Sequence, residues 1–468
     1  MFRSGFFILS GNALTSILLL MRNLLVARFI SVEDYGIAAT FAVSMAVVEM
    51  MSTLGLQQQI VQAKAGDDPH FQASLQGFQV LRGAISAIVL YLLSGPISLF
   101  LGIPHVAWAY QLLAILPFLN ALTHFDIHRL NRHMIFRPMI ITGLLPALLS
   151  VCSIWPLNIL YHDYRVLLYA LLVQSFIALI TSHVVAERPY RLAIDRAIVA
   201  QSIRFGWPIL LNGMLLFLTF NGDKLIVGRT LGMAELAILS MGTTLTLTPI
   251  LVMEQSAQTI FLPQLSRVLS DGKTFRKISL VAFQTHMVAG IFLLMCTLYF
   301  ASPFVRIFLG AEYAPLIPVL ILLAIMQAIH AFKHGNSPSS IAMLQTSNSL
   351  LCSLPKLLSL PVTAWFAGRG ADLELIIWIS ILAEFFGFLI TLILSQRRMG
   401  IPLKPLLVPG LLSILSMIFA LHSGQGMAIV ALGFSLASIC RCGRSESFYG
   451  NTGCQQNKGY SAFGTFSV

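Results

Sequence analysis

The sequence predicts an all-α integral membrane protein with about 12–14 transmembrane helices. Only 10% of the 468 residues are charged and 57% are hydrophobic, whereas soluble domains carry about 25% charged residues. The mean hydropathy over the whole chain is +0.83. Apolar runs of roughly 20 residues, the length that spans a bilayer, follow one another with short loops between them.

The first half of the chain holds six such runs. The first follows Arg3 and has no small-residue cleavage site, so we expect a membrane helix rather than a cleaved signal. The second run ends in three glutamines, Gln57 to Gln59, which are typical of a polar helix end. The predicted helices are 6–30, 37–62, 78–101, 106–123, 139–160 and 166–186.

The second half of the chain holds six further runs and a less regular end. Pro355 and Pro361 lie in one of these runs, so we expect a broken helix there, as transporters use around their sites. A run at 403–421 is long enough to span, whereas the run at 427–440 is short for a bilayer. The other predicted helices are 203–227, 235–262, 278–300, 314–332, 339–366 and 373–395.

The positive charges predict which side each loop faces. They are concentrated in alternate loops, for example at Arg129, Arg188, Arg267 and Arg397, whereas the intervening loops hold isolated arginines. Because Lys and Arg accumulate in cytoplasmic loops, we expect the N-terminus in the cytoplasm. The same distribution accounts for the net charge of +11, so no nucleic-acid partner is expected.

An internal repeat predicts two lobes. VARFISVEDYGI (26–37) aligns with VGRTLGMAELAI (227–238), which matches Arg28 with Arg229. Six predicted helices separate the two copies, and an even number gives both copies the same orientation, so the repeat is parallel. We expect an N-lobe of helices 1–6 over 1–200, a C-lobe of helices 7–12 over 201–396, an additional helix or helices over 397–440, and a disordered or aberrant tail over 441–468.

These segments also resemble a known family. RNLLVARFISVEDYGIAATFAVSMAVVEMMSTLGLQQQIVQ (22–62) resembles the opening of bacterial oligosaccharide flippases, the polysaccharide-transport branch of the MATE-like multidrug/oligosaccharidyl-lipid/polysaccharide exporter superfamily. FGWPILLNGMLLFLTFNGDKLIVGRTLG (205–232) is similar to the start of the second lobe in that family. The resemblance covers about residues 1–420 and implies two lobes in a V around a cationic lumen, in a bacterial cytoplasmic membrane.

Two segments add to or depart from this resemblance: the first helix is also similar to a second family, and the C-terminal end does not follow the pattern. MRNLLVARFIS also resembles the first helix of lipid II flippases, in which Arg22 falls on an arginine that faces the central cavity. After Ala437 the chain is rich in Gly, Ser, Asn and Cys, a composition that cannot build an apolar span. A truncated or frame-altered terminus and a genuine disordered tail both explain it. The cysteines of the tail are not expected to bind a metal, and no cofactor is expected.

Four basic residues lie inside predicted membrane helices. A charge near the bilayer centre costs about 2.5–3.5 kcal/mol on insertion scales, so such residues usually face a cavity or a partner. A guanidinium binds phosphate oxygens bidentately and stays charged. We therefore predict a cationic substrate site. For Arg22 the alternative is a salt bridge between the lobes to Asp223, and for Arg82 it is a snorkelling position. The predicted site residues are Arg22, Lys224, Lys356 and Arg82.

Further charges are expected to support that site. Asp223 and Lys224 are adjacent, so on a helix they point about 100° apart; we expect Lys224 to face the lumen and Asp223 to meet a base of the other lobe. Arg28 and Arg229 end their helices, where cations suit the helix dipole. Intramembrane acids could bind a coupling cation or proton, but we favour a structural role. The supporting charges are Asp223, Arg28, Arg229, Glu49 and Glu254, with Glu384 as a third intramembrane glutamate.

The resemblance implies a flippase that moves polyprenyl-diphosphate-linked oligosaccharide by alternating access. The sequence contains no nucleophile constellation, P-loop or large loop domain, so we expect neither an enzyme nor an ATP-driven pump, and no catalytic residue. The alternatives are a lipid II flippase and a cation-coupled multidrug exporter; the first helix holds Arg22 and no acid, which weighs against the exporter. The expected partners are lipid-linked oligosaccharide and membrane lipid, with a polysaccharide polymerase, export proteins and a coupling ion as further candidates.

Overall fold

The computed structural model describes residues 2–52, 54–345 and 347–402, together with short stretches between 410 and 417. Over these residues the chain is helical and contains no strand. Ten of the described helices are long and apolar enough to cross a membrane, or eleven if one bent pair counts as a span. The protein is a multi-pass membrane protein, and the predicted all-α fold is confirmed. Most of the predicted 397–440 addition and the whole 441–468 tail lie outside the described residues.

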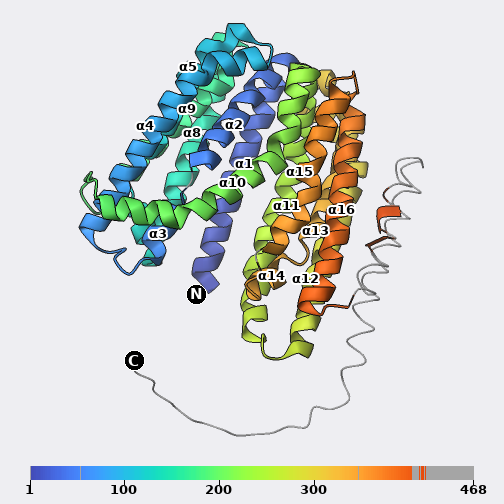
Figure 1. The fold of residues 1–468 in the computed structure, drawn as a ribbon. Coiled ribbons are helices and arrows are strands. Elements are labelled where there is room, and N and C mark those ends of the chain that lie inside the picture. The colour runs from blue at the N-terminus through green and yellow to red at the C-terminus, as the bar shows by residue number, and fades with distance from the viewer. Residues whose placement is uncertain are drawn as a thin grey trace.

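Figure 1 shows two helix bundles side by side. We use N-lobe for the bundle α1–α9 and C-lobe for the bundle α11–α16; α10 runs beneath the first bundle and then up beside the second. The N-lobe contains α1 (Phe2–Phe29), α2 (Val32–Ser52), α3 (Leu56–Gln62), α4 (Pro69–Phe100), α5 (Ala107–Leu113), α6 (Ile115–Ala121), α7 (Asp126–Arg132), α8 (Arg137–Tyr161) and α9 (Arg165–Val184), with the 3₁₀ turn η1 (Pro104–Val106).

The C-lobe follows α10 (Arg196–Thr230), so the lobe boundary predicted at residue 200 falls inside this helix. The remaining elements are α11 (Met233–Arg267), α12 (Gly272–Phe304), the π-helical turn η2 (Val305–Leu309), the 3₁₀ turn η3 (Ala311–Tyr313), α13 (Leu316–His334), α14 (Ser337–Ala342), α15 (Ser347–Ala367) and α16 (Leu373–Met399).

Aspartate caps fix the starts of several long helices. The Asp68 carboxylate accepts from the His70 N–H at the start of α4, and Asp195 accepts from the Ala197 N–H at the start of α10. Asp271 and Asp372 do the same for α12 and α16. Each carboxylate satisfies backbone donors that have no partner within the helix. The caps therefore define where these helices begin, which the hydropathy of the sequence does not show.

Some predicted helix limits are wrong in an informative way. The predicted span 37–62 divides into α2 and α3 where Gly55 takes a left-handed φ of 63°, and 106–123 divides into α5 and α6. Conversely, α15 runs unbroken through Pro355 and Pro361, so the predicted broken helix is not found. Membrane helices tolerate proline because neighbouring groups can satisfy the backbone carbonyls that it frees.

The two lobes touch at the end where α1 finishes and α11 begins. A Cβ on Gly36 of α2 would lie 1.8 Å from the Met233 carbonyl oxygen, so only glycine permits this approach. The Tyr35 and Tyr313 rings stack edge to face with 6.3 Å between centroids. In Figure 1 this contact lies at the upper end, opposite the N-terminus. The lobes are therefore closed against each other on the side away from the N-terminus.

The matched arginines of the repeat lie at this contact. A side chain at Gly310 would collide with the Arg28 guanidinium, which shows how closely Arg28 approaches the C-lobe. In the reciprocal position the Arg229 guanidinium lies 5.7 Å from the ring centre of Phe100, at the end of α4. Each arginine reaches across to the opposite bundle.

Candidate functional site

A polar cavity of about 390 Å³ lies in the N-lobe beside α4. Its walls come from the ends of α2 and α6, from α3 and from α4. Amide and hydroxyl groups of this kind match sugar hydroxyls, and an arginine matches phosphate. We call this space the polar cavity; its polar wall residues include Gln57, Gln58, Gln79, Arg82, Asn120 and Thr123.

An apolar cavity of about 510 Å³ continues along the same helix. It lies between α2, α4 and α10, and its walls include Val47, Val89 and Leu93. Val48 and Ser86 line both spaces, so the apolar cavity and the polar cavity share a wall. Along α4 the lining therefore changes from polar near Gln79 and Arg82 to apolar toward Phe100.

Lys224 is the charged residue on the wall of the apolar cavity. Its neighbour Asp223 points the other way, where its Oδ2 lies 2.5 Å from the Lys356 ammonium and 2.8 Å from the Ser380 hydroxyl. The two side chains diverge on α10, as their spacing on a helix predicts, although both also line a small space beside Lys356 and Ser380. Within the part of the chain that the structure describes, Lys224 makes no hydrogen bond or ion pair.

The partner expected for Asp223 is wrong. We expected a base from the other lobe, but Lys356 lies on α15, within the same predicted lobe as Asp223. Lys356 is only 3% exposed and is enclosed by Asp223 and Ser380. In this conformation it is therefore bound by the protein rather than free to meet a ligand.

Arg22 lies inside the N-lobe and does not form the inter-lobe salt bridge considered above. Its guanidinium donates to the Gln174 side chain on α9 and to the Ser150 hydroxyl on α8, the second at 3.4 Å. The residue is 8% exposed, and its Nε has no partner among the described residues. Sequence reasoning missed Gln174, although an amide amid the apolar residues of α9 was a usable signal.

A second group of buried charges lies within the C-lobe. The Lys333 ammonium on α13 is 2.7 Å from the Glu384 carboxylate on α16, and His330 lies between Glu384 and Glu254. Lys333 directly follows the predicted run 314–332, a position that indicates a loop, but it is 1% exposed inside the bundle. Sequence reasoning missed His330. The side chain of Glu49, another predicted supporting charge, lies outside the described part of the molecule.

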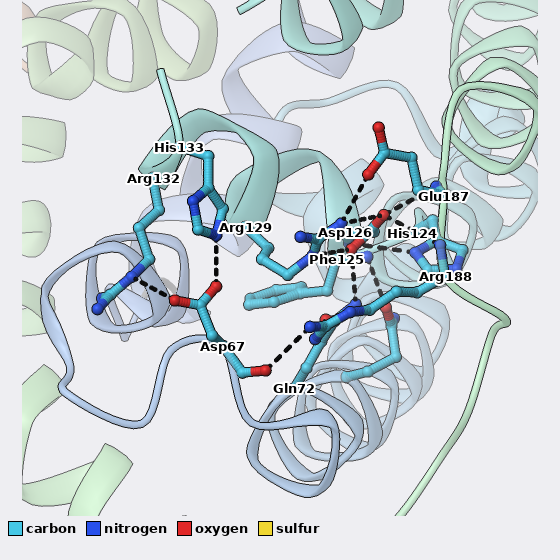
Figure 2. Close-up of polar contacts among 11 residues, drawn as sticks. Asp67, Gln72, His124, Phe125, Asp126, Arg129, Arg132, His133, Glu187 and Arg188 are labelled. Carbon is cyan, nitrogen blue, oxygen red and sulfur yellow. Dashed lines mark hydrogen bonds and ion pairs between the residues drawn. The ribbon is translucent and has the colours of Figure 1, made fainter. Parts of the chain in front are cut away.

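Figure 2 shows a network that ties α7 to the beginning of α4 and to the chain after α9. The Asp126 carboxylate accepts from the Arg129 guanidinium at 2.5 Å and from the Glu187 and Arg188 N–H groups. Around it, Arg188 donates to the Gln72 side chain at 3.0 Å. These hydrogen bonds join α7 to α4 and to the segment after α9, so they hold α7 in place.

The histidines of this region differ in exposure. His124 is 3% exposed and packs its ring against His183 and Tyr190. His133 instead lies 2.5 Å from the Asp67 carboxylate, and this hydrogen bond holds the pKa of Asp67 below its ordinary value. The side chain of His124 is therefore part of the fold, whereas that of His133 lies at the surface.

The sequence matches a family profile and two curated proteins, each over a longer stretch than the one before. The sequence profile of a family described as polysaccharide biosynthesis protein matches residues 25–318. The succinoglycan biosynthesis transport protein ExoT of Rhizobium meliloti (strain 1021) is 20% identical over 305 residues, 65% of this chain and 62% of that protein. The lipopolysaccharide biosynthesis protein WzxC of Escherichia coli (strain K12) is 22% identical over 337 residues, 69% of this chain and 66% of that protein.

The chain thus spans slightly under two thirds of the length of these curated relatives. Among solved structures, an inward-facing multidrug resistance MATE family transporter of the MOP superfamily superposes with a TM-score of 0.70. That match covers 82% of this chain and 94% of the other at 13% identity. At such an identity the likeness concerns the fold, and it confirms the MATE-like architecture.

Proposed function

This chain belongs to the polysaccharide biosynthesis protein family, and we propose that it is a flippase for polyprenyl-diphosphate-linked oligosaccharide in a bacterial cytoplasmic membrane. Its named relatives are a succinoglycan transport protein and a lipopolysaccharide biosynthesis protein. The work of such a protein is transport without a bond-making step, and it needs a site that accepts sugar, phosphate and lipid together.

One observation carries the proposal: the polar cavity and the apolar cavity share a wall, and each has a basic residue, Arg82 or Lys224. The glutamines and Asn120 of the polar cavity suit sugar hydroxyls. The apolar cavity suits part of a polyprenyl chain. A diphosphate at the junction would have a guanidinium on one side and, on the other, the Lys224 ammonium, which is unpaired among the described residues. The order of these groups along α4 matches the order of groups in the substrate.

The orientation of the site fits a substrate taken from the inner leaflet. With the N-terminus in the cytoplasm, the polar cavity lies toward the cytoplasm, and the apolar cavity extends from the bilayer interior to the outer end of α4. An inner-leaflet lipid has its headgroup and tail in the same order. The closed inter-lobe contact at Gly36 then lies on the outer side, and rocking of the lobes would open it. The membrane potential, worth about 2.3 kcal/mol per charge per 100 mV, favours outward movement of the anionic headgroup.

A cation-coupled drug exporter would need the opposite charge. The two basic residues of the joined cavities, Arg82 and Lys224, would repel a cationic drug. Further partners follow from the proposed role: an enzyme that polymerises the exported units, and export proteins on the outer side. A coupling ion would add to the driving force that the potential supplies.

The first test is made in cells. Deleting the gene in its host should stop surface or secreted polysaccharide and leave lipid-linked oligosaccharide in the inner leaflet, where periodate added outside cannot oxidise the sugar. Spheroplast lysis should expose the sugar to oxidation, and sensitivity to cationic drugs should not change. Normal polysaccharide with increased drug sensitivity would instead identify an exporter.

A further inference from the structure

Two histidines and a glutamate converge inside the C-lobe. His330 and His334 are one turn apart on α13, and Glu254 faces them from α11. One ligand atom from each lies within 4.8 Å of the others. In a tetrahedral zinc site, with bonds of about 2.1 Å, neighbouring ligand atoms are about 3.4 Å apart. Small side-chain rotations would therefore bring the three donors to bonding distance around one ion.

The donor atoms of this group are buried and unsatisfied. His330 is 3% exposed, and neither its Nε2 nor the Oε1 of Glu254 has a hydrogen-bond partner among the described residues. These two atoms are 3.9 Å apart. Buried polar atoms usually find a partner, so two facing acceptor-capable atoms without one indicate a place for a bound species.

A carboxylate behind His330 completes a known arrangement. The Glu384 carboxylate lies 3.4 Å from Nδ1 of His330, on the side away from Glu254. An Nδ1–H directed at Glu384 leaves the lone pair of Nε2 facing Glu254. Metal-binding histidines commonly have such a second carboxylate, which fixes the tautomer and strengthens the ligand. Glu384 is itself held by the Lys333 ammonium at 2.7 Å.

The acids and lysines around this group balance, because Lys224 lines the same small space as Asp223, Lys356 and Glu384, so the case for an ion rests on the geometry of the donors and not on charge. Lys333 is paired with Glu384, and Lys356 with Asp223. Glu254 is left with His330 as its partner over the residues that the structure describes. A water or hydroxide bound together with the ion would supply the fourth ligand of a tetrahedral site.

We propose that Glu254, His330 and His334 form a binding site for one divalent transition-metal ion of the zinc class, with Glu384 orienting His330. Two imidazoles and one carboxylate are a ligand set that suits zinc and cobalt. The ion would join α11 to α13 and, through Glu384, to α16. The site does not depend on the substrate proposed above, so its test reads metal binding and not transport.

The test uses the full chain, purified in detergent through a tag without histidines and stripped with chelator. Titration with Co²⁺ alone should give one equivalent with the strong visible absorption of four-coordinate cobalt, and Zn²⁺ should displace it. Glu254→Gln and His334→Gln should each weaken Co²⁺ binding by at least about 100-fold, and Glu384→Gln by about 10–100-fold, as is typical of a partner behind a ligand.

His286→Gln is the matched control, because His286 is a buried histidine of the same lobe whose Nδ1 contacts the Ala282 carbonyl, outside the ligand set. It should bind Co²⁺ like the unchanged protein. Monodisperse elution in detergent establishes that each variant is folded. If either Glu254→Gln or His334→Gln does not fold, the Co²⁺ binding of the other variant tests the site. Absence of the four-coordinate absorption at saturating Co²⁺, or its persistence in folded His334→Gln or Glu254→Gln, would refute the site.

Discussion

Replacing Lys224 or Arg82 with alanine is expected to reduce polysaccharide export by at least about 30-fold while the protein still inserts. Removing one partner of a desolvated, hydrogen-bonded charge pair costs about 2–5 kcal/mol, and each 1.4 kcal/mol is tenfold. Lys224 makes no ion pair with the described residues that the substitution would break. For Lys224→Ala the loss should therefore appear in export, measured as surface polysaccharide in a deletion host, and not in the amount of membrane protein.

Further variants distinguish a loss of substrate binding from a loss of folded protein. Lys277→Ala removes a charge from an exposed site on α12 and should leave export unchanged, whereas Lys224→Arg should keep much of it. Arg22→Ala should lower the amount of folded protein, because Gln174 and Ser150 hold this guanidinium inside the N-lobe. Normal export by a Lys224→Ala, Arg82→Ala double variant would contradict the proposed cationic site.

Asp126→Asn is expected to lower the free energy of unfolding by about 3 kcal/mol. The side chain of Asp126 is fully buried and pairs with Arg129, whose side chain is 10% exposed. Breaking a buried pair costs about 3–5 kcal/mol, and the lower end applies because Arg129 keeps Glu187 as a partner at 3.1 Å. Unfolding in dodecyl sulfate titrations, followed by loss of helical signal, measures the change.

Glu187→Gln provides the comparison within the same network. Its side chain is 62% exposed, and exposed ion pairs contribute only about 0–1 kcal/mol. This variant should unfold at nearly the denaturant concentration of the unchanged protein. Equal destabilisation by both substitutions would show that the buried carboxylate of Asp126 is not the main tie in the network shown in Figure 2.

Much of the fold follows from the sequence because hydropathy, loop charge and the repeat are local signals. The divergence of Asp223 and Lys224 also follows, since adjacent helical residues point about 100° apart. Breaks such as Gly55 were not predictable from composition, because the apolar run continues through them. Lys333 ends an apolar run and so suggested a loop, although its partner Glu384 holds it in the bundle.

The site was less predictable because its partners lie far apart in the chain. Arg22 and Gln174 are 152 positions apart, and Lys356 and Asp223 are 133 apart. A sequence shows that each charge needs a partner but not which partner it has. Only Arg82 and Lys224, of the four predicted site residues, line the joined cavities in this conformation. Arg22 and Lys356 remain predictions that another conformation would have to expose.

Flipping by the purified protein tests the central claim most directly. Proteoliposomes would carry a fluorescent polyprenyl-diphosphate oligosaccharide in both leaflets, and an impermeant quencher would report the outer fraction. Unchanged protein should make nearly all of the label accessible over time, whereas the Lys224→Ala, Arg82→Ala variant should leave about half protected, as in protein-free vesicles. Equal access with both proteins would contradict the assignment of the joined cavities as the substrate path, and no gain over empty vesicles with the unchanged protein would contradict the flippase itself.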